Sequence, residues 1–357
     1  MTSTYLVLQA FRQPESLAKL SLPEWDLLVR QARVGDLLAN LYLLLEERGL
    51  AERIPSQARE HFEWARIFAE RHSQAVEWEV SQIQKALAGV GIPLILLKGA
   101  AYVMAGFPRA HGRLFSDIDI LVPKESLNAV EAALMLHGWA STHLDEYDQR
   151  YYRTWMHELP PMQHIRRMSS IDVHHAILPE TAPLRPDPEK LRAAARLIEG
   201  HKDLMVLAPA DMVLHSAVHL MHGEMDNGLR DLIDIDILVR HFGTAPTFWM
   251  ELVARAKQLE LVRPLFYVLR YAKRLLYTPI PASAIEAADA GKPGPLTLAL
   301  MDQFVQRAVM PDHASMRDIF TKPARHILYV RANWLRMPPF LLARHLFHKA
   351  FLSPKPE

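Results

Sequence analysis

The segment from residue 91 to 180 constrains the fold most, because it interrupts a chain whose apolar residues otherwise recur at helical spacing. Within it, the apolar run at residues 93–97 and the alternating run DIDILVP at 117–123 have the length and pattern of strands. Helical patterns stand beside these runs. We therefore expect an α+β fold, with an N-terminal helical region over residues 1–90, the core over 91–180, and a C-terminal helical region over 181–357.

The composition is that of an ordinary globular protein and excludes some chemistry. The 357 residues suffice for two or three domains, and 50% of them are hydrophobic. The formal net charge is +1, so no overall field attracts nucleic acid. The absence of cysteine excludes disulfides, thiolate metal sites and cysteine nucleophiles. Neither a signal sequence nor an apolar run of transmembrane length is recognisable, so we expect a cytoplasmic protein.

The hexapeptide DIDILV occurs twice, at residues 117–122 and at residues 234–239. The first copy alternates acidic and aliphatic residues, and residues two apart in a strand point to the same face. Asp117 and Asp119 should therefore project together. Two adjacent carboxylates repel each other, and a divalent cation relieves that repulsion. Taken alone, the pair is better interpreted as two harmless acids at a solvated strand end.

The second copy stands in a helical environment. It lies in an apolar stripe at helical spacing, which follows a break at Asn227 and Gly228. Residues two apart in a helix lie roughly 200° apart around the axis, at about 100° per residue. Asp234 and Asp236 should therefore face away from each other, and Arg230 could pair with Asp234 on the surface, in the weaker order with the basic residue first. We interpret this copy as structural.

The first copy has further polar residues around it. Lys98 and Gly99 follow the apolar run at residues 93–97 and begin a helix, where free backbone N–H groups and a glycine suit phosphate oxygens. Arg113 precedes the acids, and Asp172 lies in a later strand with the same acid-between-aliphatics pattern. Three carboxylates on neighbouring strands, with a glycine turn and basic residues, suit a nucleoside triphosphate with Mg²⁺.

The stretch LILLKGAAYVMAGFPRAHGRLFSDIDILVPKESL, followed by IDVHH, resembles the uncharacterised nucleotidyltransferase family of the DNA polymerase beta-like superfamily. The superfamily signature is a turn of glycine and a small residue, then Asp-x-Asp on a strand, then a third Asp on another strand. Gly99 and Ala100 stand at the turn, where Ala100 replaces the usual serine. The acids of the signature stand at Asp117, Asp119 and Asp172. The gap between the turn and the acid pair is longer than in many members.

The resemblance covers roughly residues 90–240 and implies both a fold and an activity. It implies a small mixed β-sheet nucleotidyltransferase core that transfers a nucleoside monophosphate from a nucleoside triphosphate to an acceptor by a two-metal mechanism with Mg²⁺. The residues that it implies for metal binding and catalysis are Asp117, Asp119 and Asp172. The residues that it implies for holding the triphosphate are Lys98, Gly99, Ala100 and Arg113. The base stays open, with ATP as one candidate.

Three histidines on one helix face supply an alternative site: His215, His219 and His222. They could hold a transition metal, as in a metallohydrolase. They could instead pack on Asp231 or Asp226 as a structural face, or lie over the nucleotide. His174 should share its strand face with Asp172, either beside the metal site or as a buried, satisfied histidine.

A rival function from another class is a non-catalytic module with this fold that binds a nucleotide or a partner. The intact set of three acids argues against it, because loss of an acid is the simplest route to an inactive relative. For an enzyme, the acceptor stays open as a small molecule or a protein, and the near-neutral charge argues against long nucleic acid.

The C-terminal tail is basic. From residue 319 to residue 356 it contains seven Lys or Arg and no Asp or Glu. Its amphipathic pattern suits contact with a partner or an anionic membrane surface, or docking on its own domain.

Overall fold

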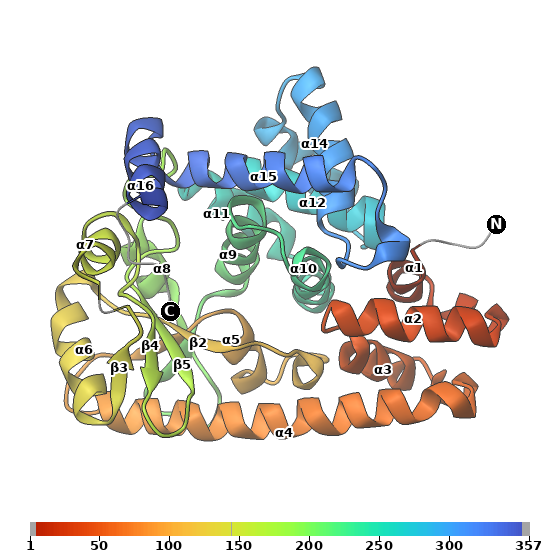
Figure 1. Cartoon of the computed structure of the whole chain (residues 1–357), viewed down its shortest axis with the longest axis horizontal. Helices are drawn as coiled ribbons and strands as arrows, with labels where there is room; N and C mark the ends of the chain where they lie inside the picture. The colour runs from red at the N-terminus through yellow and green to blue at the C-terminus, as the bar shows by residue number, and fades with distance from the viewer. Residues whose placement is uncertain (1–4, 144, 352–357) are drawn as a thin grey trace.

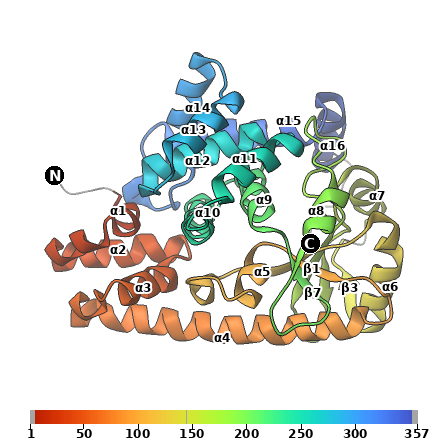
Figure 2. The ribbon, with the colours of Figure 1, turned by 180° about the vertical axis from the view of Figure 1, so that it is seen from behind.

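The computed structural model of the protein describes residues 5–143 and 145–351 and confirms an α+β fold (Figure 1). The N-terminal helices are α1 (Leu6–Arg12), α2 (Leu22–Val34), α3 (Leu38–Glu47) and α4 (Ser56–Leu87). A capping box begins α2, in which the Ser21 N–H donates to the Glu24 carboxylate at 2.8 Å. The 32-residue α4 runs beneath both the other N-terminal helices and the sheet (Figures 1 and 2). It therefore connects the two ends of the molecule.

The mixed sheet has seven strands in the order β3-β4-β5-β2-β1-β7-β6. The strands are β1 (Leu94–Leu96), β2 (Asp117–Leu121), β3 (Trp139–Ser141), β4 (Met162–His164), β5 (Ser170–His174), β6 (Arg196–Leu197) and β7 (Leu204–Val206). The strands β6 and β7 correct our expectation that only helices follow residue 180. They form because β7 pairs in parallel with β1 and β6 pairs with β7. The sequence did not reveal them, because strands of two or three residues are too short to show a period.

The strands β2 and β5 are parallel neighbours, with Asp119 opposite Asp172 and Asp117 opposite Ser170. Residues paired in this way point to the same face of a sheet, so the three predicted acids share one face. The isoleucines between the acids of β2 are buried on the other face. The strand β1 is antiparallel to β2, and the Leu97 N–H donates to the Asp119 carbonyl at 2.9 Å. This pairing brings the end of β1 next to the acids.

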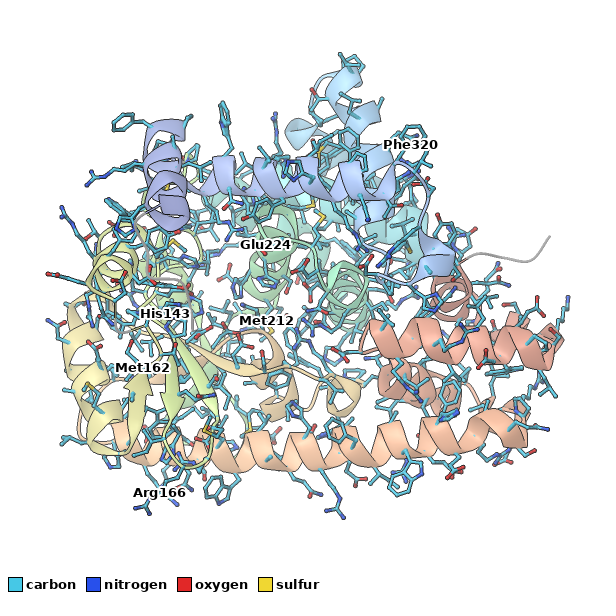
Figure 3. The ribbon with its side chains drawn as sticks, viewed as in Figure 1. His143, Met162, Arg166, Met212, Glu224 and Phe320 are labelled. Carbon is cyan, nitrogen blue, oxygen red and sulfur yellow. The ribbon has the colours of Figure 1, made fainter. Side chains whose placement is uncertain are left out.

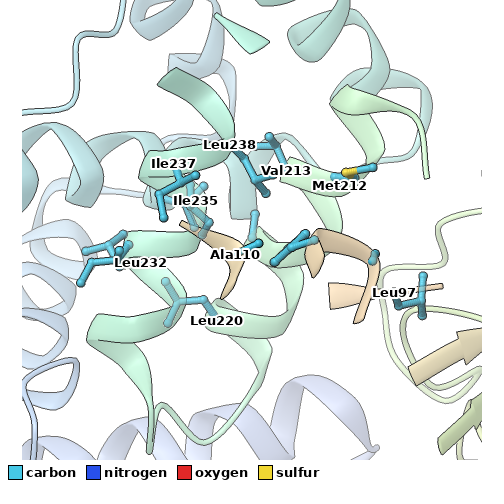
Figure 4. Packing of buried hydrophobic residues seen from close by; sticks show 14 of the residues in the cluster. Leu97, Ala110, Met212, Val213, Leu220, Leu232, Ile235, Ile237 and Leu238 are labelled. Atoms are coloured by element: carbon cyan, nitrogen blue, oxygen red, sulfur yellow. The ribbon is translucent and has the colours of Figure 1, made fainter. Parts of the chain in front are cut away.

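Helices cover the sheet and build the C-terminal half of the chain. Those close to the sheet are α5 (Lys98–Met104), α6 (Leu127–Leu136), α7 (Glu146–Trp155) and α8 (Pro188–Ala194). The C-terminal helices are α9 (Pro209–His222), α10 (Gly228–Phe242), α11 (Phe248–Gln258), α12 (Val262–Leu276), α13 (Ala282–Ala288), α14 (Pro295–Ala308), α15 (Thr321–Arg336) and α16 (Pro339–Phe351). The central α9 packs against α10, α11, α12 and α15. Aliphatic side chains of α9 and α10 meet there, together with Ala110 (Figure 4).

The second copy of the hexapeptide lies in α10, as predicted, but its acids are not on the surface. Asp234 and Asp236 are only 6% and 8% exposed. Asp234 accepts a hydrogen bond from Arg113 Nε at 2.6 Å, so the predicted surface pair with Arg230 is wrong. Arg230 instead donates to the Leu114 carbonyl at 3.0 Å. Helical spacing could not reveal the true partner, which lies 121 residues away in the sequence.

The described part of the basic tail packs on the rest of the protein. Arg331 of α15 donates to the Met221 carbonyl at the end of α9 at 2.8 Å. His348 of α16 stacks on Tyr147 of α7, with 3.5 Å between the ring centroids. Among the residues that the structure describes, no helix is long and apolar enough to cross a membrane.

Candidate active site

Lys98 is the first residue of α5, directly after β1, and lies on the side of the sheet that carries the acids. Its φ of +43° lies in the left-handed region, which is unfavourable for a residue other than glycine. Its Nζ lies 3.1 Å from Asp119 Oδ1. Burial alone would lower the pKa of Lys98, but Asp119 and Asp117 raise it above its usual value. The turn therefore holds a permanent positive charge beside the acids.

Gly99 is required by close packing at the start of α5. A Cβ at this position would collide with the Arg113 guanidinium and lie 2.7 Å from the Phe115 ring. Ala100, the next residue, is 1% exposed. Both residues are buried, and their part in holding a triphosphate stays a prediction.

Asp119 and Asp172 lie side by side on the neighbouring strands β2 and β5, but their pKa values are shifted in opposite directions. The buried Asp119 contacts Lys98, and its Oδ1 is 2.8 Å from His174 Nε2. Burial opposes ionisation of Asp119, but Lys98 and His174 outweigh it and lower the pKa of Asp119. Burial, followed by the charges of Asp119 and Glu158, raises the pKa of Asp172 to about 7. One carboxylate stays charged, while its neighbour exchanges a proton near neutral pH.

Glu158 and His157 are site residues that the sequence analysis missed. Glu158 Oε2 lies 3.1 Å from His174 Nδ1, and the His157 and His174 ring centroids are 5.3 Å apart. His174 shares the face of Asp172, as predicted, and connects Asp119 with Glu158. An isolated bridge between Glu158 and His174 joins the loop after α7 to β5, and the Leu159 N–H donates to the Val173 carbonyl at 2.9 Å. A His-Glu pair in a loop has no periodic signal, so nothing in the sequence pointed to it.

Two groups of side chains in the described part of the chain could hold a metal ion. They are Asp119, Asp172 and His174, and His157, Glu158 and His174. Within each group the ligand atoms lie within 4.8 Å of one another. Asp117 belongs to neither group, although it lies on the same face, and its Oδ1 accepts a hydrogen bond from Ser116 Oγ at 3.2 Å. The structure thus brings two of the three predicted acids together.

The group with two carboxylates fits a divalent cation. Carboxylate oxygens suit Mg²⁺ and Mn²⁺, and an imidazole nitrogen suits transition metals. Burial, followed by the charges of Asp119 and Glu158, raises the pKa of Asp172, and a bound cation would relieve the repulsion between these acids.

Arg113 lies behind Gly99 and has different partners from Lys98. Its side chain is 6% exposed, its Nε donates to Asp234 at 2.6 Å, and its Nη2 lies 3.8 Å from Asp231 Oδ1. Burial would lower the pKa of Arg113, but Asp234 and Asp231 raise it, so the guanidinium stays charged. Arg113 thereby joins the turn at Gly99 to α10, and its predicted contact with a triphosphate stays a prediction.

The three histidines of α9 have separate environments. His219 Nε2 lies 3.5 Å from Asp231 Oδ2, one of the two acids on which this face could pack. Burial, with a contribution from Lys98, holds the pKa of His215 well below its usual range. Burial lowers the pKa of His222 to about 4. Within the described residues, neither group that could hold a metal includes any of the three.

Comparison with known families assigns the chain to a group of proteins. A family model described as an uncharacterised nucleotidyltransferase matches residues 21–277, which is well over half of the chain. The chain belongs to this nucleotidyltransferase family. No curated protein and no solved structure matches it. The family match confirms the resemblance seen in the sequence. It extends from α2 to α12 and therefore includes the whole sheet. Figure 3 labels two residues of the matched part, Met162 on β4 and Met212 on α9.

Proposed function

We propose that the protein transfers a nucleoside monophosphate from a nucleoside triphosphate, with ATP as a first candidate, to the hydroxyl of an acceptor. The observation that carries the proposal is the pairing of Asp119 with Asp172 across two parallel strands, with Lys98 Nζ 3.1 Å from Asp119. Phosphoryl transfer depends mainly on positioning and charge neutralisation. Family membership supports the same reaction class.

Two Mg²⁺ ions are proposed as cofactors, held by the acids Asp117, Asp119 and Asp172. His174 is added to this set because its ligand atom lies within 4.8 Å of those of Asp119 and Asp172. When bound, the ions would neutralise phosphate charge and lower the pKa of the acceptor hydroxyl.

Each protein group has a proposed role in the transfer. Asp172 takes the proton of the acceptor hydroxyl on a carboxylate oxygen. The acceptor oxygen bonds to the α-phosphorus, the bond from that phosphorus to the oxygen bridging to the β-phosphate breaks, and pyrophosphate leaves. Lys98, with the backbone at Gly99 and Ala100, is proposed to hold the triphosphate, while Arg113 holds the turn.

A non-catalytic nucleotide-binding module is the second candidate. The observation in its favour is that the side chains of Lys98 and His174 alone can neutralise the charge of Asp119. Such a site could bind a nucleotide and leave it intact.

A transfer assay separates these candidates. The protein is incubated with Mg²⁺ and each of the four triphosphates labelled at the α-phosphate, with small-molecule and protein fractions of a cell extract as acceptors. We expect label in a product, and loss of that product with Asp172→Asn. Nucleotide binding without transfer would favour the non-catalytic module, and neither binding nor transfer would contradict both candidates.

The acceptor is proposed to be a small molecule or a protein. Any contact of the basic tail with a partner or a membrane surface is proposed for its exposed side chains. Trp334 on α15 and Phe340 on α16 are 58% and 79% exposed.

A further inference from the structure

A cavity lies between the long helix α4 and the first residues of the strands β2 and β5. Its volume is about 290 Å³, near the lower end for small-molecule sites at roughly 300 Å³, so it suits one ring system of a substrate and not a whole nucleotide. Asp117, an acid proposed to hold Mg²⁺, lines the cavity. Ser170, which lies opposite Asp117 in the strand register, lines it as well. The cavity therefore begins at the proposed active site.

Aromatic side chains form part of the wall of this cavity. Trp78 of α4 is 52% exposed, so its ring is accessible to a ligand. The Arg167 guanidinium lies 5.4 Å from the Trp78 ring centroid. Arg167 in turn donates to the Glu79 carboxylate from Nε at 2.9 Å and from Nη2 at 2.8 Å. These contacts hold the wall at Trp78 in place before a ligand binds.

Phe115 connects the cavity to the turn assigned to the triphosphate. Its ring lines the cavity and packs edge-on against the His72 ring, with 4.8 Å between the centroids. A Cβ at Gly99 would lie 2.7 Å from the Phe115 ring, so this ring lies directly beside the first turn of α5. A substrate whose phosphates are bound at that turn can therefore extend along Phe115 into the cavity.

The charges around the cavity favour an uncharged ring as its occupant. Of the charged residues that line it, Arg167 and Glu79 pair with each other, and Asp117 is assigned to Mg²⁺. Burial, followed by the charge of Arg113, lowers the pKa of His72, so this imidazole is neutral at neutral pH. A nucleobase fits these walls, because it is an uncharged, flat ring system that stacks on aromatic side chains.

The acceptor is expected on the other side of the acids. Asp172, which is proposed to take the proton of the acceptor, is not among the described residues that line the cavity. Its ligand atom lies within 4.8 Å of those of Asp119 and His174, and His174 Nδ1 lies 3.1 Å from Glu158 Oε2. An acceptor beside Asp172 and Glu158 therefore leaves the cavity at Asp117 to the nucleotide.

We propose that this cavity binds the base of the nucleoside triphosphate, in contact with the rings of Trp78 and Phe115 and with Ser170 at the polar edge of the base. The inference rests on the proposed function, which places the triphosphate at Lys98 and Gly99, beside Phe115. Purines should bind more tightly than pyrimidines, because the larger ring system has more surface to stack. The aromatic wall then determines which nucleotide the protein transfers.

Calorimetric titration compares a ligand that has a base with one that has none. The protein with Mg²⁺ is titrated with the non-reacting analogue α,β-methylene-ATP and, separately, with inorganic tripolyphosphate. We expect Trp78→Ala to weaken binding of the analogue about tenfold or more and to change binding of tripolyphosphate less than about twofold. Trp64→Ala is the matched control and should change both less than about twofold. Trp64 is a 63% exposed tryptophan of the same helix and lines a different cavity.

The α,β-methylene analogues of GTP, CTP and UTP test the preference for a purine. The two purine analogues should bind about threefold or more tightly than the two pyrimidine analogues, because they stack over a larger surface. Trp78→Ala should reduce this difference, whereas Trp64→Ala should leave it unchanged. A pyrimidine analogue that binds more tightly than both purine analogues would contradict the preference.

Two results would overturn the assignment of the base to this cavity. One is equal binding of α,β-methylene-ATP by the parent and Trp78→Ala, which would leave the proposed function in place because the nucleotide still binds. The other is an equal loss of analogue and tripolyphosphate binding in Trp78→Ala, which would mean that the variant disturbs the triphosphate turn. A parent protein that binds neither ligand would contradict the proposed function together with this inference.

Discussion

At the scale of single residues, neighbouring side chains set the chemistry of otherwise similar acids. Asp119 is buried but stays ionised, because Lys98 and His174 contact it. Asp172 is the directly paired residue on β5, and burial, followed by the charges of Asp119 and Glu158, raises its pKa to about 7. The pair therefore combines a fixed charge with a group that exchanges protons near neutral pH.

The buried histidines predict a loss of stability in acid. The pKa of His222 is about 4 in the folded protein and 6.5 in an unfolded chain. Because the folded pKa is lowered, the stability is fully present above pH 6.5 and is lost as the pH falls toward 4. Between about pH 7.5 and about pH 5, His222 should cost on the order of 1–2 kcal/mol of unfolding free energy, at about 1.4 kcal/mol per pKa unit.

Urea unfolding at the two pH values measures this loss. The parent should lose more stability than His222→Gln, which carries no titratable group. His157 and His215 act in the same direction in both proteins. An equal loss in the parent and the variant would contradict this assignment.

At the scale of elements, the second hexapeptide connects α10, through Arg113, to the first turn of α5. Asp234 of α10 binds Arg113, and Arg113 in turn packs against Gly99. Asp236 points to other partners and accepts hydrogen bonds from Arg240 Nε at 2.8 Å and Thr278 Oγ1 at 2.5 Å. The two copies thus share a sequence but place their acids differently, because the first copy is a strand and the second a helix.

Breaking the buried ion pair should destabilise the protein strongly. Asp234→Ala leaves the Arg113 guanidinium buried without its main partner and should cost about 3–5 kcal/mol. The double variant Arg113→Met, Asp234→Leu removes both charges and should cost much less than Asp234→Ala. Urea unfolding at neutral pH measures both values. A double variant at least as unstable as Asp234→Ala would show that the pair is not the source of the effect.

The first turn of α5 should not tolerate a side chain at position 99, where the chain has glycine. Gly99→Ala forces a methyl group into Arg113 and Phe115 and should destabilise the protein by about 1–3 kcal/mol. Gly89→Ala is the matched control, because a Cβ there meets no atom within 4 Å. Melting temperatures of the two variants compare them directly, and equal values would refute the packing argument.

The sequence predicted those features that repeat within one element. Asp117, Asp119 and Asp172 were found because a period of two marks their strands, and the strand register confirms that they share one face. Glu158 was not found, because a loop carries it and its pairing with β5 leaves no local pattern in the sequence. The buried partner of Asp234 was missed for the same reason, since tertiary contact and not local pattern determines it.

At the scale of the whole molecule, helices from both ends of the chain meet the sheet. The long α4 lies beneath it, while α9 and α10 cover the region around Lys98 and Arg113 (Figures 1 and 2). The family match includes α4, the sheet, α9 and α10, whereas α15 lies outside it. We therefore expect the reaction class to follow from the matched part of the chain.

The most direct test of the account compares one acid from each copy of the hexapeptide. The rate of nucleotidyl transfer, per amount of folded protein, is measured for Asp119→Asn and Asp236→Asn at a temperature at which both are folded. We predict that Asp119→Asn lowers the rate by roughly a hundredfold or more, because it removes a charge positioned at the reacting phosphate. Asp236→Asn should stay within about threefold of the parent, because its partners are Arg240 and Thr278. Transfer by Asp119→Asn at the parent rate, or an equal loss in folded Asp236→Asn, would contradict the account.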